Sequence, residues 1–577
     1  MRVKTSGIFL LGIACAFAPM HAETSSSDVV VYGGTAAGVI AAVAAAREGS
    51  TVTLVEPGRH LGGMASGGLG WTDFGKPEVI GGMSREFFQR VGKKYGDTVA
   101  WHHEPHVAES VFNEMAREAG IKIRLETRMK ETGGLIKSGA VLTGLISESG
   151  DVFQGKVFVD ATYEGDLMAK AGVDYTWGRE ASSQYGESLA GVRARSEKHQ
   201  FPAGLSPLGS DGKLLPEISA GPRGAVGSGD KKIQAYNFRL CMTDQADNRL
   251  PFLKPAGYDP ARYALLGRFV NAMIAADATG AVGPGTFMKL DLVHGRKTDT
   301  NNNGGFSTDY IGGSWDYPDA GYAARAEIWK QHILYTQGFF WFLQNDPSIP
   351  KAFQDKMAAW GLSKDEFTDN GGWPFQLYVR ESRRMLGEYV MTQKDIQTDR
   401  AKPEGIGMGS YNSDSHNVQR VVNDQGAVEN EGDVQVAVNP YEIPYRILTP
   451  KRAQATNLLV PVCFSASHTS YSTLRMEPQY MILGHAAGVA AHMAAKTGKP
   501  VQEIDVQALR SALKAEKAEL GATPVTLADR GSVGLSFGPV SLPASEAGFN
   551  LVGRSFRNAA GGSGISYLKT GLRPSSK

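Results

Sequence analysis

The sequence predicts an α/β fold built on a parallel β-sheet, and three observations near its start predict it. Residues 28–32 contain an unbroken run of β-branched residues, Val29 to Val31, which is typical of a strand covered on both faces of a parallel sheet. A glycine-rich turn and an alanine-rich stretch to Arg47 follow, which indicates a buried helix, and Gly49 stands where a left-handed helix cap is expected. Residues 51–55 supply a second strand. Together these segments form a βαβ unit.

The turn between the first strand and the helix has the residue types that hold a dinucleotide. Gly33 allows the sharp turn, Gly38 lets helix and strand pack closely, and the helix N-terminus offers free N–H groups to a pyrophosphate. Glu56 ends the second strand, where an acid accepts hydrogen bonds from the adenosine ribose. Thr35 replaces the middle glycine of G-x-G-x-x-G, and its hydroxyl could donate to a phosphate oxygen. The expected contacts are Gly33, Gly34, Thr35, Ala36, Ala37, Gly38 and Glu56.

A second glycine-dense loop follows Glu56 directly and favours FAD over NAD. Such a loop is expected where backbone runs along the ribityl chain and ring of a flavin, because glycine lets the main chain approach a ligand closely. A domain that binds only NAD does not need it. The alternative is a glycine-rich turn in an unrelated α/β domain. The expected contacts in the loop are Pro57, Arg59, Gly62, Gly63, Met64, Ser66, Gly67 and Gly68.

Composition excludes several partner classes. Lys and Arg number 60 against 59 for Asp and Glu, so no field favours nucleic acid or an anionic membrane, and small molecules are the expected partners. Beyond the first 22 residues only Cys241 and Cys463 remain. They could form one disulfide and cannot supply the four thiolates of an iron–sulfur cluster. No metal site is expected.

The first residues have the features of a targeting segment. Arg2 and Lys4 give a positive start, residues 8–17 are apolar, and Ala22 ends a plausible cleavage site. The apolar run is shorter than the roughly 20 residues that span a bilayer as a helix. The sequence therefore predicts a signal peptide and a periplasmic or secreted mature protein without a membrane span.

With these motifs the sequence resembles a family of bacterial FAD-dependent oxidoreductases, which is related in fold to fumarate reductase flavin subunits and glutathione reductases. The resemblance covers most of residues 28–495 and rests on five segments: residues 32–38, 62–68, 160–167, 414–420 and 457–491. It implies FAD as cofactor and poorly defined substrates that include sugars. The flavin subunit of heterodisulfide reductases is more distantly similar, and this chain lacks the cysteines of its clusters.

The resemblance also implies further cofactor contacts. A predicted strand over residues 153–159 ends at Asp160, Ala161 and Thr162, which resemble the family's second contact with the dinucleotide. Near the end, Glu477 and Pro478 open a long apolar helix, and in related folds this helix aims its positive end at the flavin pyrimidine edge. Glu477 is therefore included among the expected cofactor contacts.

These features predict a Rossmann-like FAD-binding domain assembled from N- and C-terminal segments, with an inserted α+β substrate or cap domain. Residues 175–315 show little periodicity, while residues 322–342 and 375–394 have apolar residues at helical spacing. The expected segments are a signal peptide (1–22), the first part of the FAD-binding domain (23–174), a partly helical cap region (175–440), the C-terminal part of the FAD-binding domain (441–500) and a partly disordered C-terminal extension (501–577).

Four residues are candidates for the chemistry. Removal of hydride from an alcohol or amine carbon requires a base for the accompanying proton, and His416 and His468 lie in segments that resemble family regions near the flavin ring. Structural hydrogen bonding is the alternative for both histidines. Arg446 and Arg475 flank the last strand, where an arginine could hold a substrate carboxylate or, paired with Glu477, serve only the fold.

Other polar residues carry weaker indications. His60 lies near the position where fumarate reductase relatives attach flavin covalently, and His485 is expected in the core. Glu164 or Asp166 could orient substrate or a ribityl hydroxyl. A charged cluster on the helix predicted over residues 375–394 is expected to be a solvated face with local pairing. Its members are Arg380, Glu381, Arg383 and Arg384.

The sequence thus predicts an FAD-dependent dehydrogenase that transfers hydride from a polar small molecule, a sugar or sugar acid, to flavin and then to an unknown electron acceptor. One alternative reverses the direction, as in fumarate reductases, with an arginine as proton donor to an activated alkene. A second is a lyase or isomerase that acts on carbohydrate and uses flavin without net redox. A third is a binding module that has kept the fold and lost FAD.

Overall fold

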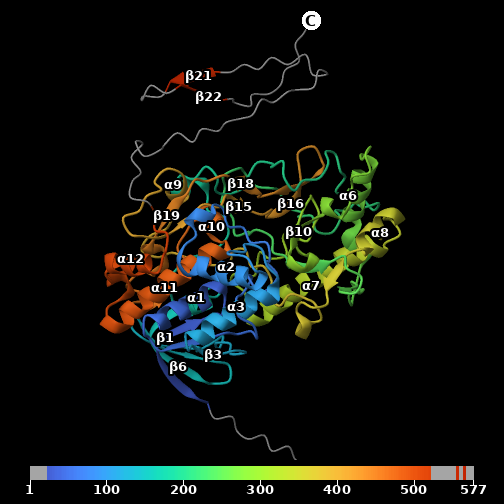
Figure 1. The fold of residues 1–577 in the computed structure, drawn as a ribbon. Helices are drawn as coiled ribbons and strands as arrows, with labels where there is room; N and C mark the ends of the chain where they lie inside the picture. The colour runs from blue at the N-terminus through green and yellow to red at the C-terminus, as the bar shows by residue number, and fades with distance from the viewer. Residues whose placement is uncertain (1–21, 522–553, 558–562, 567–577) are drawn as a thin grey trace, which may run out of the picture. The chain divides into compact units, whose positions relative to one another are not determined.

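The computed structural model describes residues 22–521 and the short segments 554–557 and 563–566 (Figure 1). The described residues up to Gly521 belong to one compact unit. In the second unit, β21 (Arg554–Arg557) and β22 (Ser563–Ser566) form an antiparallel pair. The expected signal peptide, apart from Ala22, and most of the expected tail lie outside the described residues. None of the helices in the described part is long and apolar enough to cross a membrane.

Segments from both ends of the chain build one seven-stranded sheet, as the sequence predicts. Its order is β3-β2-β1-β6-β5-β4, and β20 pairs with β6. Strands β1, β2, β3, β6 and β20 run parallel, whereas β5 and β4 are antiparallel additions. The bounds are β1 Thr24–Tyr32, β2 Val52–Val55, β3 Lys122–Arg124, β4 Leu135–Ser138, β5 Val141–Ile146, β6 Val152–Asp160 and β20 Leu458–Leu459.

Helices α1 (Ala36–Arg47) and α11 (Glu477–Thr497) pack closely against each other beside this sheet (Figure 1). A Cβ on Gly484 would lie 2.3 Å from the Ala37 carbonyl oxygen, and a Cβ on Gly488 would lie 2.2 Å from that of Ala41. Only glycine permits this approach, so the C-terminal helix is fitted to the N-terminal one. Helices α2 (Gly82–Tyr95) and α3 (Pro105–Glu118) complete this group.

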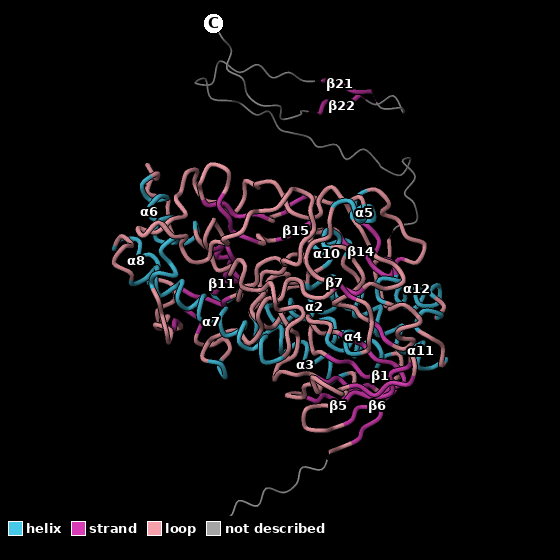
Figure 2. Tube along the Cα trace, turned by 180° about the vertical axis from the view of Figure 1, so that it is seen from behind, coloured by secondary structure: helices cyan, strands magenta, loops and turns pink. Residues whose placement is uncertain are grey.

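The inserted region has its own antiparallel sheet of order β10-β11-β8-β12-β9 and a set of helices (Figure 2). Its strands are β8 Leu240–Thr243, β9 Arg249–Leu250, β10 Met288–Val293, β11 Lys297–Asn302 and β12 Gly361–Ser363, and its helices are α6 Ala264–Ala275, α7 Tyr322–Asn345 and α8 Lys351–Ala358. Helix α7 confirms the helix expected over residues 322–342. The sheet lies mainly within residues 175–315, where the sequence shows little periodicity.

The helix expected over residues 375–394 is wrong. The segment is irregular, with one short strand, β13 (Arg384–Met385), paired to β7 (Tyr175–Thr176), and α9 (Gln393–Gln397) begins only at its end. The charged cluster within it is buried and not solvated. Its partners come from distant segments: Arg380 pairs with Asp309 (3.1 Å), Arg383 with Asp166 (2.7 Å), Arg384 with Glu180 (2.5 Å), and Glu381 with His468 (2.8 Å). The apolar residues of this segment recur because it is buried between these partners, and not because it forms a helix.

The remaining elements connect these two sheets and close the C-terminal side. Three antiparallel strand pairs are β14 Gly405–Gly409 with β19 Tyr441–Pro444, β15 Ser413–Ser415 with β18 Val434–Val436, and β16 Gln419–Val422 with β17 Val428–Glu431. The remaining helices are α4 Asp166–Lys170, α5 Ser182–Tyr185, α10 His468–Leu474 and α12 Val506–Ala515. Leu509 and Leu513 of α12 are buried, so the described part of the expected extension packs on the core. Cys241 and Cys463 are buried and unpaired.

Candidate functional site

The turn between β1 and α1 is a tight backbone cradle. Gly33 has a φ of +99°, and a Cβ there would lie 2.8 Å from the carbonyl carbon of Ala161. A Cβ on Gly38 would lie 1.9 Å from the Gly33 oxygen. The Thr35 hydroxyl accepts from Gly38 N (3.2 Å) and donates to Ala161 O (2.7 Å), so it ties the turn to the end of β6. Since Val39 N makes the first bond of the helix, the amides before it have no helical partner and suit an anion.

Glu56 lies at the mouth of this cradle, as the sequence predicts for the ribose acid. Its carboxylate accepts one bond from Gly34 N and one from Gly58 N, each 2.5 Å long. Burial raises the pKa of Glu56 to about 7, and the two amide bonds only partly oppose this shift. A ligand hydroxyl that donates to the carboxylate would favour its ionised form.

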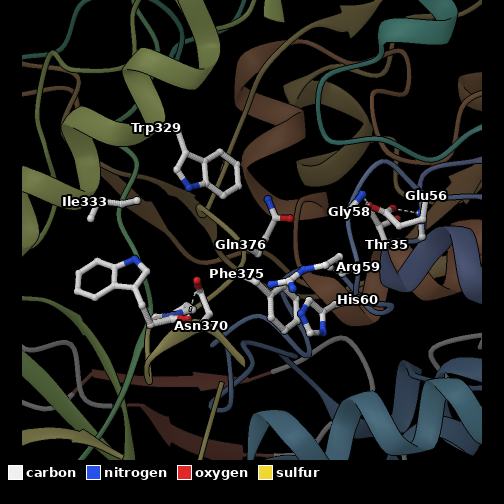
Figure 3. Close-up of a pocket in the computed structure, with 14 residues that line it drawn as sticks. Thr35, Glu56, Gly58, Arg59, His60, Trp329, Ile333, Asn370, Phe375 and Gln376 are labelled. Atoms are coloured by element: carbon white, nitrogen blue, oxygen red, sulfur yellow. Dashed lines mark hydrogen bonds between the residues drawn. The ribbon is translucent and has the colours of Figure 1, made fainter. Parts of the chain in front are cut away.

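Three adjoining cavities of about 360, 510 and 360 Å³ lie beside the cradle, and Glu56 lines the first two. The first and second share six lining residues: Thr35, Glu56, Gly58, Trp329, Phe375 and Gln376 (Figure 3). The third extends along residues at the carboxyl ends of β1 and β6: Tyr32, Thr162, Glu164 and Asp166. The space is therefore elongated, as a dinucleotide requires.

The glycine loop after Glu56 runs from these cavities towards the N-terminus of α11. Gly62 N donates to Gly34 O (2.7 Å), and Met64 N donates to the Tyr163 hydroxyl (2.8 Å). Tyr163 donates in turn to Glu477 Oε1 (2.7 Å). A Cβ on Gly63 would lie 2.4 Å from the Tyr163 hydroxyl, so the loop and the helix end are fitted together through this tyrosine.

The other predicted contacts in this loop hold its shape. Pro57 lines two of the cavities, and Arg59 forms an ion pair with Asp369 (3.2 Å). The Ser66 hydroxyl donates to Leu61 O (2.6 Å). The end of the loop abuts two residues of the inserted region, because a Cβ on Gly67 would lie 2.5 Å from Gln376 Cβ and one on Gly68 would lie 2.0 Å from Arg239 O.

Of the three predicted contacts at the end of β6, residues 160–162, only Thr162 lines the cavities. The buried Asp160 carboxylate accepts from Thr162 N (3.1 Å) and Met168 N (2.7 Å), so it shapes the loop and is not among the cavity-lining residues. Burial raises the pKa of Asp160 to about 6. Ala161 accepts the Thr35 bond, and Thr162 lines two of the cavities.

Buried polar atoms without partners lie at the start of α11. Glu477 Oε2 has no hydrogen-bond partner, and neither side-chain polar atom of Gln479 has one. Burial raises the pKa of Glu477 to about 8. Because unpaired buried polar groups are costly, their presence beside the glycine loop indicates a missing ligand with polar edges. The cradle thus fits the pyrophosphate in the middle of FAD, with the adenosine ribose at Glu56, and the atoms at the start of α11 fit polar edges of the flavin end.

A separate polar pocket of about 370 Å³ lies beyond the glycine loop. Gln376, which lines the first cavity, and Tyr378, which lines this pocket, are two residues apart in the chain. His416 and Arg475, two of the predicted catalytic residues, both line it. Its other charged or aromatic lining residues are Asp73, Lys198, His199, Arg239, Lys289, Tyr378, Tyr411 and Asp414.

His416 is held by a carboxylate from the inserted region. Its Nδ1 lies 2.7 Å from Asp309 Oδ2, and its Nε2 lies 3.9 Å from Asp414 Oδ1. Burial, with the Arg380 guanidinium, lowers the pKa of His416 well below its ordinary value of 6.5. The imidazole is therefore neutral near pH 7, and with Nδ1–H donating to Asp309, Nε2 is left as the basic nitrogen.

Arg475 also lines this pocket and shares Asp414 with His416. It donates to Asp414 O (2.8 Å) and to the Tyr378 hydroxyl (3.1 Å), and it does not pair with Glu477. The Tyr378 ring also lies 5.9 Å from the guanidinium of Arg239, which Asp299 holds through two bonds of 2.7 Å. Sequence reasoning missed Arg239, Tyr378 and Asp309, since no local motif marks them.

Of the other candidates, His468 and Arg446 line neither space, whereas His60, Glu164 and Asp166 line the dinucleotide cavities. His468 is buried at the start of α10, where its Nδ1 lies 2.8 Å from Glu381 Oε2. The Arg446 side chain is 52% exposed and pairs with Glu404. His60 lines the first cavity, but Glu109 (2.9 Å) and Asp369 (3.1 Å) bind both of its nitrogens. His485 is buried in α11.

One group of possible metal ligands occurs among the described residues, formed by Glu104, His106 and Glu366. The Lys297 ammonium contacts Glu104 (2.7 Å) and Glu366 (2.6 Å). Lys297 thus supplies the positive charge that these carboxylates need.

A Rossmann-like sheet, a glycine cradle with its ribose acid and a second glycine loop define the class of flavin-binding oxidoreductases. The chain belongs to the FAD dependent oxidoreductase family, whose sequence profile matches residues 28–513. The protein is accordingly an FAD-dependent oxidoreductase, and FAD is its cofactor. A search of curated protein sequences finds no match.

Solved structures give short matches. L-proline dehydrogenase from P. horikoshii is 18% identical with a TM-score of 0.22, over 28% of this chain and 59% of that one. L-amino acid deaminase from Proteus vulgaris is 17% identical with a TM-score of 0.21, over 27% and 53%. The flavin-dependent brominase Bmp2 is 16% identical with a TM-score of 0.21, over 26% and 42%. The matches thus span between 42% and 59% of the lengths of these three proteins.

Proposed function

We propose that the protein is a dehydrogenase that oxidises a hydroxyl-bearing carbon of a polar small molecule, with His416 as the base. The observation that carries this proposal is the Asp309–His416 pair in a polar pocket next to the glycine loop. FAD supplies the acceptor for the hydride, that is, for two electrons and one hydrogen. The substrate C–H bond breaks, and the alcohol becomes a carbonyl.

His416 takes the proton that the hydroxyl loses. Asp309 accepts from Nδ1–H and fixes the ring, so that Nε2 faces the substrate as a proton acceptor. The imidazolium that forms is stabilised by Asp309 and by Asp414, whose carboxylate oxygen lies 3.9 Å from Nε2. Burial opposes the charge of Asp414, but its cationic neighbours, Arg475 among them, outweigh this effect and lower its pKa.

The charges of the pocket favour a sugar acid over a neutral sugar. Four cationic side chains line it, Lys198, Arg239, Lys289 and Arg475, against two carboxylates, Asp73 and Asp414. Burial raises the pKa of Asp73, which reduces the negative charge further. Amide and hydroxyl groups from Asn301, Asn302, Asn303 and Tyr411 suit a substrate with several hydroxyls.

Anaerobic reduction of the bound flavin tests this proposal. D-glucuronate and D-glucose serve as probes, and loss of the visible flavin absorbance under either one supports dehydrogenation, with the acid expected to act faster. His416→Ala should retain FAD and fail to bleach. If neither sugar bleaches the enzyme but fumarate reoxidises its chemically reduced form, the reverse direction holds, with Arg475 as proton donor. Turnover of a carbohydrate without acceptor and without oxygen uptake would instead indicate a lyase or isomerase.

We also propose that the protein acts in the periplasm or outside the cell. The proposal rests on the positive start, the apolar run and the cleavage site in residues 1–22. Cell fractionation and N-terminal sequencing test it, and a mature chain that begins at Glu23 is expected. A cytoplasmic protein that keeps Met1 would contradict it.

A further inference from the structure

We propose that Trp329, from helix α7 of the inserted region, covers the adenosine half of FAD opposite Glu56. The cofactor would then be held between two parts of the protein, the Rossmann-like cradle below and an indole from the inserted region above. The proposal deepens the function given above by assigning a cofactor-binding role to a residue outside every dinucleotide motif of the chain.

The position of Trp329 carries the inference. Among the residues that line the three cavities beside the cradle, Trp329 alone lines all three. Glu56 lines the first and second cavities, and Arg128 lines the second and third. The indole thus faces the space between Glu56 and the residues at the carboxyl ends of β1 and β6. An adenine whose ribose binds Glu56 must extend into this space.

Helix α7 presents this face by its periodicity. Trp329 and Ile333 are four residues apart, so they lie on the same side of the helix, and both line the first cavity. Figure 3 shows the two side chains projecting from one helix towards the space that Glu56, Thr35 and Gly58 bound on the other side. The face is broad, apolar and opposed to a polar cradle.

Aromatic neighbours hold the indole in place. The Phe238 ring lies 6.0 Å from the Trp329 ring at 71°, and it lies 5.3 Å from the Trp373 ring at 66°. Phe238 is fully buried, whereas Trp329 is only half-buried and keeps surface towards the cavity. A π-face fixed in this way is suited to stack on a purine, and base stacking on an aromatic side chain tolerates little displacement.

The competing explanation is that Trp329 only packs the inserted region. Helix α7 offers a matched control, because Trp341 lies on the same helix, is also half-buried and is absent from the lining of the three cavities. A packing role predicts a loss of stability for Trp329→Ala with no selective loss of nucleotide binding. The cofactor role predicts a loss of nucleotide binding for Trp329→Ala alone.

The test measures binding of FAD, ADP and FMN to the flavin-free full chain by calorimetry. Trp329→Ala should weaken FAD and ADP by about tenfold or more, a size expected for the loss of one stacked base, while FMN, which lacks adenosine, binds as to the wild type. Trp329→Phe should restore most of the affinity, and Trp341→Ala should leave all three ligands unchanged. If the flavin-free chain does not stay folded, the release of FAD on heating the holoenzyme gives the same ranking.

Wild-type affinity of Trp329→Ala for both FAD and ADP would overturn the proposal, as would an equal loss for Trp341→Ala. A loss for FMN as large as that for ADP would also overturn it, because the effect would then not concern adenosine. These readouts do not depend on the dehydrogenase proposal, which fails separately if no sugar reduces the flavin.

Discussion

The cradle around Glu56 and the pocket around His416 lie close together, yet they are built in opposite ways. The cradle is mostly backbone, because most of its groups are amides and glycines of one stretch of chain, residues 33–68, closed by the end of β6. The pocket is made of charged side chains from segments far apart, as the Asp309–His416 pair illustrates. The first site should therefore be sensitive to added volume and the second to removed charge.

The largest effect should come from adding volume to the cradle. Gly38→Val places a Cβ that would lie 1.9 Å from the Gly33 oxygen, so the turn must deform. We expect purified protein without visible flavin absorbance and a loss of stability on the order of 3 kcal/mol or more by thermal unfolding. Gly285→Ala is the control, because its Cβ would meet no atom within 4 Å. A yellow, fully stable Gly38→Val protein would refute the comparison.

Removing the base from the pocket should act on turnover alone. His416→Ala should lower kcat by roughly 10²- to 10⁴-fold, the usual contribution of a general base, with FAD retained because His416 is not part of the cradle. Asp309→Asn should lower kcat less, since it keeps a partner for the ring. Stopped-flow flavin reduction measures the step directly. If flavin reduction in His416→Ala were as fast as in the wild type, another residue would be the base.

The replacement of one carboxylate in the cradle gives a smaller effect. Glu56→Gln removes a charged acceptor for the ribose hydroxyls, so the Kd for FAD should rise by about 10- to 100-fold in calorimetry. Because the pKa of Glu56 is raised to about 7 and the ribose favours the carboxylate, wild-type affinity should increase as pH rises through that value. Glu56→Gln should show no such increase. An identical pH dependence in both proteins would assign the titration to another group.

The pH profile of turnover should differ from that of an exposed histidine. Burial lowers the pKa of His416 well below its ordinary value of 6.5, so the base stays unprotonated at the pH where an exposed histidine gains its proton. The folded protein binds fewer protons at this site than the unfolded chain, so the associated stability is present above 6.5 and is lost as pH falls towards the lower folded value. We expect kcat/KM for flavin reduction to be flat between about pH 6 and pH 8. If kcat/KM fell to half near pH 6.5, His416 would titrate as a solvent-exposed histidine does.

The smallest effect should be at Arg446, which lies outside both sites. Its side chain is 52% exposed and pairs with Glu404 on the surface. Arg446→Ala should change the free energy of unfolding by less than about 0.5 kcal/mol and leave FAD binding and kcat within about twofold. A tenfold loss of kcat would extend the functional site to this surface.

The same contrast explains what the sequence could predict. Gly33, Gly38 and Glu56 follow one another within a single βαβ unit, so residue type and spacing predict this turn and its acid, although not the contact of Gly33 with Ala161. His416 and Arg475 were found through resemblance, but Asp309 lies more than a hundred residues before His416 and has no periodic signal of its own.

The helix expected over residues 375–394 failed for a related reason. Its apolar residues recur at helical spacing, but its charges pair with distant groups, as Arg380 does with Asp309 and Glu381 with His468. These long-range ion pairs outweigh local helix propensity, and no single-sequence pattern reveals them. The sequence pattern therefore predicts a solvated charged face where the structure has a buried charged segment.

The close fit of α1 and α11 has a consequence for how the protein is made. Ala37 and Ala41 emerge from the ribosome first and must wait for Gly484 and Gly488, almost the whole chain later, before their face is covered. Such distant contacts form slowly and leave an apolar surface open in the meantime. A chain shortened before Gly484 should be captured by chaperones and degraded, and the complete chain should acquire its cofactor only after synthesis has ended.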